Sequence, residues 1–358
     1  MILLTAAASF CQMIGFSELP ETVSTFTGSY FYSRTLESKE ESENIQQWVL
    51  PLFATSLITE GLRIRIHQTV SAAQMEGGPS LSGLGNTRIR SSFSLFENTL
   101  MTYLGLSFPV TGADTEEETA SLSNLLYSEI LEFGVRRIAE GFNLDTGFVF
   151  AQPFGKFALS FGAGYVLRGG YDRPSQTEKP ASYNPGDALS ITTGIHFRRI
   201  TTSLNGRILY FHYGDDRIDN NNVFKSGDEF SVLASAEFRF KPLILMLSLT
   251  DTVKAESEAR QSGVDVNNLY SNRLNAGISL TYPLLREILI LKAQANAKGF
   301  FDDGNVSAKV ASLDGDFQLI IKDNLTLDVL AGFMSGDMDT GKTDISGFSL
   351  GLVINYGF

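Results

Sequence analysis

The chain has one cysteine, Cys11, and three histidines among 358 residues. One cysteine cannot form an intrachain disulfide, and the two residue types together are too few for a cysteine- or histidine-rich metal centre. Lysine and arginine number 28 against 40 aspartates and glutamates, so the formal net charge is −12. Without a basic excess to neutralise phosphates, the composition argues against nucleic acid as a partner. We also expect no metal and no cofactor.

Long hydrophobic runs are missing as well. The longest uncharged stretch is 1–17, and its most apolar part spans only 2–10. A helix that crosses a bilayer needs about 20 residues, whereas a short apolar stretch is typical of a signal peptide. We therefore expect residues 1–17 to be a signal peptide or N-terminal segment, and residues 18–358 to form one folded domain.

The dominant pattern is alternation of apolar residues with small or polar ones over long segments. Clear examples are 155–170, 286–300 and 344–358. Strands of soluble sheets average about five or six residues, whereas a strand that crosses a bilayer at a tilt needs about 9 to 11. A large soluble sandwich is the alternative, but it does not explain the length of these segments. The pattern therefore predicts membrane-spanning strands.

Turn signals divide the chain into about sixteen such segments, with a range of twelve to sixteen. They are 23–36, 46–57, 61–73, 84–96, 98–111, 142–152, 155–170, 187–198, 199–213, 227–240, 242–255, 268–282, 286–300, 305–321, 324–336 and 344–358. Short and long connections alternate along the chain, which is typical of a barrel with turns at one end and loops at the other. The predicted fold is all-β: an antiparallel up-and-down transmembrane β-barrel.

One segment, 121–140, breaks the strand pattern. As a helix it has apolar residues on one face and a glycine after its end, whereas a strand here would make the total odd. Bacterial single-chain barrels have even strand numbers. We therefore predict a short helix in this extracellular loop, lying in or over the barrel mouth.

The last strand carries a specific signal. Apolar or aromatic residues occupy alternate positions up to the final carboxylate: Leu350, Leu352, Ile354, Tyr356 and Phe358. This pattern resembles the insertion signal that outer-membrane barrels present to the barrel-insertion machinery. The strand must also pair with the first one, because unpaired backbone groups are not tolerated in hydrocarbon.

Three glycine-containing motifs carry a family resemblance across residues 46–200. They are Gly83-Leu84-Gly85-Asn86-Thr87, Leu104-Gly105-Leu106 leading to Pro109-Val110-Thr111-Gly112, and Asn184-Pro185-Gly186-Asp187. The sequence here resembles the outer-membrane family of the MetA pathway of phenol degradation, which is similar to FadL-type channels. Asn86, where an acidic residue is usual, departs from the pattern, as does Val110 between Pro109 and Thr111. The resemblance implies passive uptake of small hydrophobic or aromatic solutes.

A basic cluster falls on one face of two neighbouring predicted strands. Its members are Arg63, Arg65, His67, Arg88 and Arg90. A charge on the lipid face costs about 2–4 kcal/mol near the midplane, so we expect this face to point into the lumen. There it would form a constriction that orients an anionic or carboxylated solute. The alternative is an arginine ladder that pairs across the lumen with Glu229, Glu237 or Asp328.

Catalysis is a weaker interpretation of the same chain. A catalytic base must lie within hydrogen-bond reach of its partner, and the available histidines are His67, His196 and His212. The first two fall on inward positions and the third near a mouth, and no recognisable serine motif accompanies them. We expect no enzyme activity.

The sequence thus predicts a channel in the outer membrane of a Gram-negative bacterium, surrounded by outer-membrane lipid and passing a small-molecule solute. A general diffusion porin is the alternative. A structural or assembly barrel, with protein partners in the outer membrane, is a third interpretation.

Overall fold

A computed structural model describes residues 24–39, 42–109, 117–135, 141–173, 181–259, 272–285, 288–302, 305–338 and 341–357. The predicted signal segment 1–17 and the terminal Phe358 lie outside these ranges. Among the described residues, no helix is long and apolar enough to cross a membrane.

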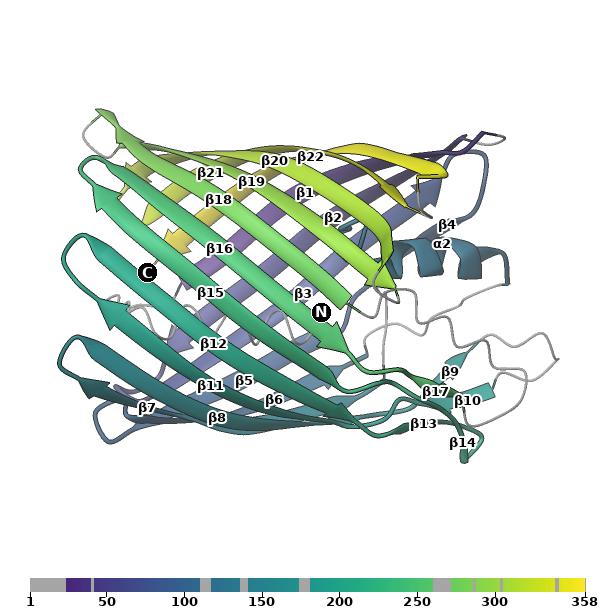
Figure 1. Cartoon of the computed structure of the whole chain (residues 1–358), viewed down its shortest axis with the longest axis horizontal. Coiled ribbons are helices and arrows are strands. Elements are labelled where there is room, and N and C mark those ends of the chain that lie inside the picture. The colour runs from purple at the N-terminus through teal and green to yellow at the C-terminus, as the bar shows by residue number, and fades with distance from the viewer. Residues whose placement is uncertain are drawn as a thin grey trace.

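Sixteen antiparallel strands form one closed barrel (Figure 1). Neighbours in the chain are neighbours in the wall, and the last strand, β22 (Thr343–Gly357), pairs along its length with the first, β1 (Ser24–Glu37). The wall between them contains β2 (Ser42–Leu57), β3 (Leu62–Met75), β4 (Ser80–Leu84), β5 (Thr87–Leu95), β6 (Leu100–Phe108), β7 (Asn143–Phe154), β8 (Phe157–Arg168), β11 (Ala188–Arg198), β12 (Thr202–Tyr213), β15 (Glu229–Phe240), β16 (Leu243–Lys254), β18 (Asn272–Leu284), β19 (Leu289–Asp302), β20 (Asn305–Lys322) and β21 (Leu325–Met338). Closure pairs the first strand with the last, so neither is left as a free edge.

The predicted strand 84–96 is interrupted in the structure. β4 and β5 both pair with β3 and together make one barrel strand, but Gly85 and Asn86 between them leave the ladder. The side chain of Gln68 donates to the carbonyl of Gly85 at 2.8 Å, and Asn86 donates to Ser107 Oγ at 3.2 Å. The Gln68 side chain therefore satisfies the carbonyl of Gly85 at the break, while the backbone N–H of Gly85 still donates to the carbonyl of Thr69 on β3 at 2.7 Å.

Alternation along each strand separates an exposed apolar exterior from an inward-facing side. On β22, Leu350, Leu352 and Ile354 are 52%, 48% and 42% exposed, whereas Val353 between them is 2% exposed. The exposed side chains face the surroundings of the barrel and the buried one faces inward. An exterior of this kind is stable in hydrocarbon, which explains why so many large apolar side chains are exposed.

The long connections lie at one end of the barrel as predicted, but the predicted long loops 37–45 and 74–83 are short: only 38–41 separates β1 from β2, and only 76–79 separates β3 from β4. Short turns such as 96–99 and 155–156 lie at one end of the barrel, and the long connections lie at the other (Figure 1). A small second sheet stands at this long-loop end, where a hydrogen bond from the backbone of Gly186 to Asp216 (2.7 Å) helps to hold it. Its strands are β9 (Tyr171–Arg173), β10 (Ala181–Asn184), β13 (Asp215–Ile218), β14 (Asn221–Lys225) and β17 (Glu258–Ala259).

The predicted helix exists, but with different bounds. Helix α2 spans Glu117–Tyr127 rather than 121–140, and residues 128–135 continue without regular structure. We call residues 117–135 the inserted segment. Its side chains Leu122, Leu126, Ile130, Leu131 and Phe133 are at most 3% exposed. They pack against inward-facing residues of the wall: Leu36, Ile45, Ala73, Phe300, Ala308, Val310, Met334 and Ile345.

Contacts with the wall explain why the helix ends early. The backbone carbonyl of Leu131 accepts a hydrogen bond from Arg34 Nε at 2.7 Å. Val135 exchanges two hydrogen bonds with the Gln47 side chain, at 2.6 and 3.0 Å. The wall thus satisfies backbone groups that a longer helix would have paired internally. Glu132, with φ of 53°, marks the departure from helical geometry.

Candidate functional site

The strand register brings the predicted basic cluster together on the luminal wall. β3 and β5 pair so that Arg65 lies opposite Arg90 and His67 lies opposite Arg88. The intervening pair, Ile66 and Ile89, faces outward and is 43% and 37% exposed. Arg63 continues the inward face of β3, opposite Ser92. Their role in solute passage stays a prediction.

An aromatic ring and a hydroxyl group contact His67 of this cluster. The imidazole of His67 stacks on the ring of Phe53, with centroids 4.1 Å apart and an interplanar angle of 8°. Its Nε2 lies 2.9 Å from Thr69 Oγ1. This histidine therefore packs as a polar luminal side chain beside the arginines. His196 also faces inward, whereas His212 faces outward near the long-loop end, with Nδ1 2.9 Å from Asp228 Oδ1.

Arg90 makes two further contacts on the luminal wall. Its guanidinium carbon lies 4.0 Å from the centroid of the Tyr103 ring, a cation–π geometry. Its Nη2 lies 3.4 Å from Asp145 Oδ2. A carboxylate from a third strand thus reaches the arginine cluster, although sequence reasoning did not include Asp145 or Tyr103.

The carboxylates that were candidate partners for the arginines have neighbours of their own. The nearest charged or polar contacts are Glu229 with Arg273 (3.1 Å) and Lys254 (3.9 Å), Glu237 with Arg239 (2.6 Å), and Asp328 with Asn355 (3.0 Å). The strand register explains this, because each contact joins residues on the same strand or on strands close in the wall. The structure therefore does not support the ladder across the lumen.

Charged residues of the wall also hold the inserted segment. Glu129 pairs with Arg273 and Glu132 pairs with Lys298. Arg34, 4% exposed, bonds the carbonyls of Leu131 and Phe348 and lies 5.7 Å from the ring centroid of Phe133. These contacts join residues far apart in the sequence, so alternation could not reveal them. The inserted segment is a fixed part of the lumen that narrows it.

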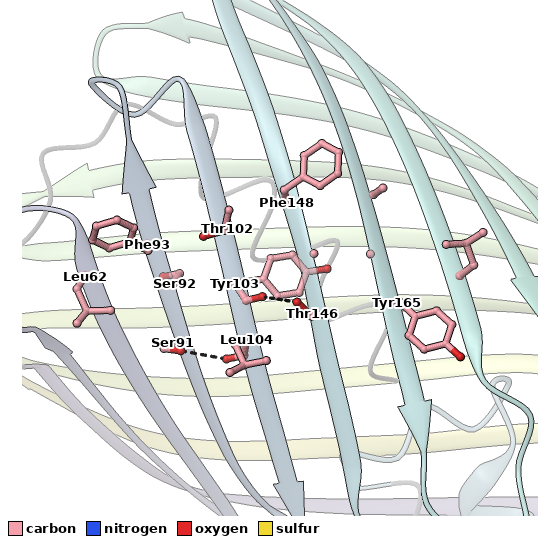
Figure 2. A pocket seen from close by; sticks show the side chains of 14 residues that line it. Leu62, Ser91, Ser92, Phe93, Thr102, Tyr103, Leu104, Thr146, Phe148 and Tyr165 are labelled. Atoms are coloured by element: carbon pink, nitrogen blue, oxygen red, sulfur yellow. Dashed lines mark hydrogen bonds between the residues drawn. The ribbon is translucent and has the colours of Figure 1, made fainter.

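The outer wall has a shallow pocket across β5 to β8 (Figure 2). Outward-facing Phe93, Leu104 and Phe148 surround small hydroxyl residues. Ser91 Oγ donates to the carbonyl of Leu104 at 3.3 Å, and Thr146 Oγ1 donates to that of Tyr103 at 3.2 Å. Because these hydroxyls are satisfied by backbone, they can face an apolar environment.

Comparisons with solved structures place the fold among bacterial outer-membrane barrels. OprB of Pseudomonas putida aligns with a TM-score of 0.52 and 10% identity, over 98% of this chain and 97% of that one. An anion-selective porin from Comamonas acidovorans aligns at 0.45 and 12%, over 94% and 99%. OccK7 of Pseudomonas aeruginosa aligns at 0.45 and 11%, over 94% and 99%. No family model and no curated protein matches the chain.

The closed sixteen-stranded wall and its apolar exterior make this chain a barrel of the bacterial outer membrane. The comparisons show an outer-membrane barrel fold and do not support the narrower resemblance to the phenol-degradation and FadL-type families. The motif residues that carried that resemblance have structural roles here. Gly85 and Asn86 mark the break in the fourth strand, and Asp187 accepts hydrogen bonds from Tyr165 and from the backbone of Arg168.

Proposed function

We propose that the barrel is a passive channel through which small carboxylated solutes, aromatic ones among them, cross the outer membrane. The observation that carries this proposal is the basic cluster: four arginines on the inward faces of β3 and β5, with Arg65 directly opposite Arg90. Like charges so placed repel one another, and a passing anion relieves that repulsion. Diffusion down a gradient needs neither cofactor nor energy input.

The aromatic part of the proposal rests on the neighbours of the cluster. Phe53 stacks on His67, and Tyr103 lies under Arg90. Planar rings beside guanidinium groups suit a solute that carries both a ring and a carboxylate, since rings stack on rings and on guanidinium planes. The hydrophobic solute that the family resemblance also implies gains no such support from the basic cluster, whose contacts are charged, polar or aromatic.

The test is ion selectivity in planar bilayers. The purified barrel is compared with a variant in which Arg63, Arg65, Arg88 and Arg90 are all replaced by glutamine. The expected result is an anion-selective wild type whose reversal potential in a potassium chloride gradient shifts towards that of potassium in the variant. A matched control replaces two inward arginines of another region, Arg198 and Arg239, and should shift the potential less.

Two outcomes would overturn the proposal. An unchanged reversal potential in the fourfold variant would show that the cluster does not select ions, and the barrel would then be a general porin. A folded, heat-modifiable wild type without conductance would point instead to a structural or assembly barrel.

A further inference from the structure

A glycine and an aspartate build a specific environment around one arginine of the cluster. Arg90, Gly105 and Asp145 occupy one row of the wall, on β5, β6 and β7. A Cβ on Gly105 would overlap the carboxylate of Asp145. Because Gly105 has no side chain, Asp145 lies across β6 and reaches Arg90.

The next row places Tyr103 beside the same arginine. Tyr103 pairs with Gly147 on β7, and Gly147 pairs with Gly164 on β8. A Cβ on either glycine would overlap the phenol of Tyr103. The ring therefore extends from β6 towards β7 along the inner wall (Figure 2). Arg90 lies against this ring, 4.0 Å from its centroid, so the guanidinium is backed by a rigid plane.

The contact between Arg90 and Asp145 is loose. Their atoms are 3.4 Å apart, and the side chains are 28% and 27% exposed. Charge-assisted hydrogen bonds between nitrogen and oxygen are normally about 2.7–2.9 Å long. By contrast, Arg239 meets Glu237 at 2.6 Å, and Arg273 is shared by Glu129 and Glu229. Because Asp145 holds the guanidinium of Arg90 only weakly, a second carboxylate can take its place on the same donors.

We propose that Arg90, on its Tyr103 support, is the carboxylate-binding subsite of the lumen, and that Asp145 is an internal carboxylate which the solute displaces. This inference rests on the proposed function and names the residues that determine its specificity. Asp145 lowers the affinity of Arg90 for the solute by competition, because it pairs with the guanidinium when no solute is present. Tyr103 is a positioning residue, because it fixes the plane of the guanidinium without contributing charge.

The experiment measures block of chloride current by benzoate in wild-type and variant barrels. Asp145→Asn should lower the half-blocking concentration about fivefold, the factor that corresponds to losing a partly exposed ion pair of about 1 kcal/mol. Glu237→Gln, which removes another luminal carboxylate next to an arginine, is the matched control and should leave the block unchanged. Tyr103→Leu should weaken the block, whereas Tyr103→Phe should retain it.

The outcomes separate this inference from the proposed function. If the wild type conducts and selects anions, but Asp145→Asn and Arg90→Gln leave the benzoate block unchanged, the subsite is wrong and the channel stands. If the folded wild type does not conduct, the channel proposal fails, and benzoate binding to the barrel in detergent, measured by calorimetry, tests the subsite alone. Binding that is lost in Arg90→Gln and strengthened in Asp145→Asn would support it. Equal binding by all three proteins would overturn it.

Discussion

Arg65 and Arg90 face each other directly across the β3–β5 ladder, and both point into the lumen. Two like charges in a cross-strand pair destabilise a sheet, typically by a few tenths of a kcal/mol to about 1 kcal/mol. The Arg65–Arg90 pair therefore lowers the stability of the folded barrel. Its functional consequence is a positive potential at one place on the luminal wall.

Salt concentration should modulate that potential. The Debye length is about 10 Å at 0.1 M salt and about 3 Å at 1 M, so concentrated salt screens the cluster from a passing ion. We expect the anion selectivity of the wild type to fall as the salt concentration in both compartments is raised from the lower to the higher value. Reversal potentials at a fixed concentration ratio measure this. Selectivity that does not depend on salt would mean that pore size, not the arginines, sets it.

The inserted segment should depend on Arg34. The replacement Arg34→Met removes the donor to the carbonyls of Leu131 and Phe348. Leaving buried acceptors unsatisfied costs about 1–3 kcal/mol, so the unfolding free energy in urea should fall by that amount. Single-channel current should also become noisier, because the segment is less firmly held. Arg198→Met, on the inward face of β11, is the control, and equal effects of both variants would argue against a specific anchor.

How much of this structure the sequence could predict depends on how far apart in the chain the contacting residues lie. The strands were predictable because lipid requires an apolar residue at every second position, which is a local pattern. The direction of Arg63 and Arg90 followed from the same rule. The position of Asp145 across Gly105 did not, since it depends on the register of three strands. The anchoring of the inserted segment by Gln47 joins residues 88 positions apart and has no local signature.

The two faces of one strand should tolerate a charge to different degrees. On β16, Leu249 faces outward and is 47% exposed, whereas its neighbour Thr250 faces inward. Leu249→Arg should destabilise the barrel in liposomes by about 2–4 kcal/mol, because arginine on the lipid face must be desolvated. Thr250→Arg should cost much less. Denaturant unfolding followed by tryptophan fluorescence measures both, and equal losses would contradict the assigned faces.

Phe358 should matter for assembly in cells rather than for the folded barrel. Removing it should lower the amount of barrel in the outer membrane, because this aromatic residue is part of the alternating pattern predicted to be the insertion signal. Phe358→Tyr keeps an aromatic residue and should restore the level. Refolding into detergent, which needs no machinery, should be similar for all three proteins. A normal membrane level after removal would exclude this residue from the signal.

A preference of the lumen for carboxylates can be measured with two solutes of nearly equal size and opposite charge. Benzoate and benzylammonium are loaded separately into proteoliposomes that contain the wild-type barrel, and their rates of release are compared with those from protein-free vesicles. We expect the barrel to accelerate the release of benzoate more than the release of benzylammonium. Equal acceleration, or faster release of the cation, would contradict it.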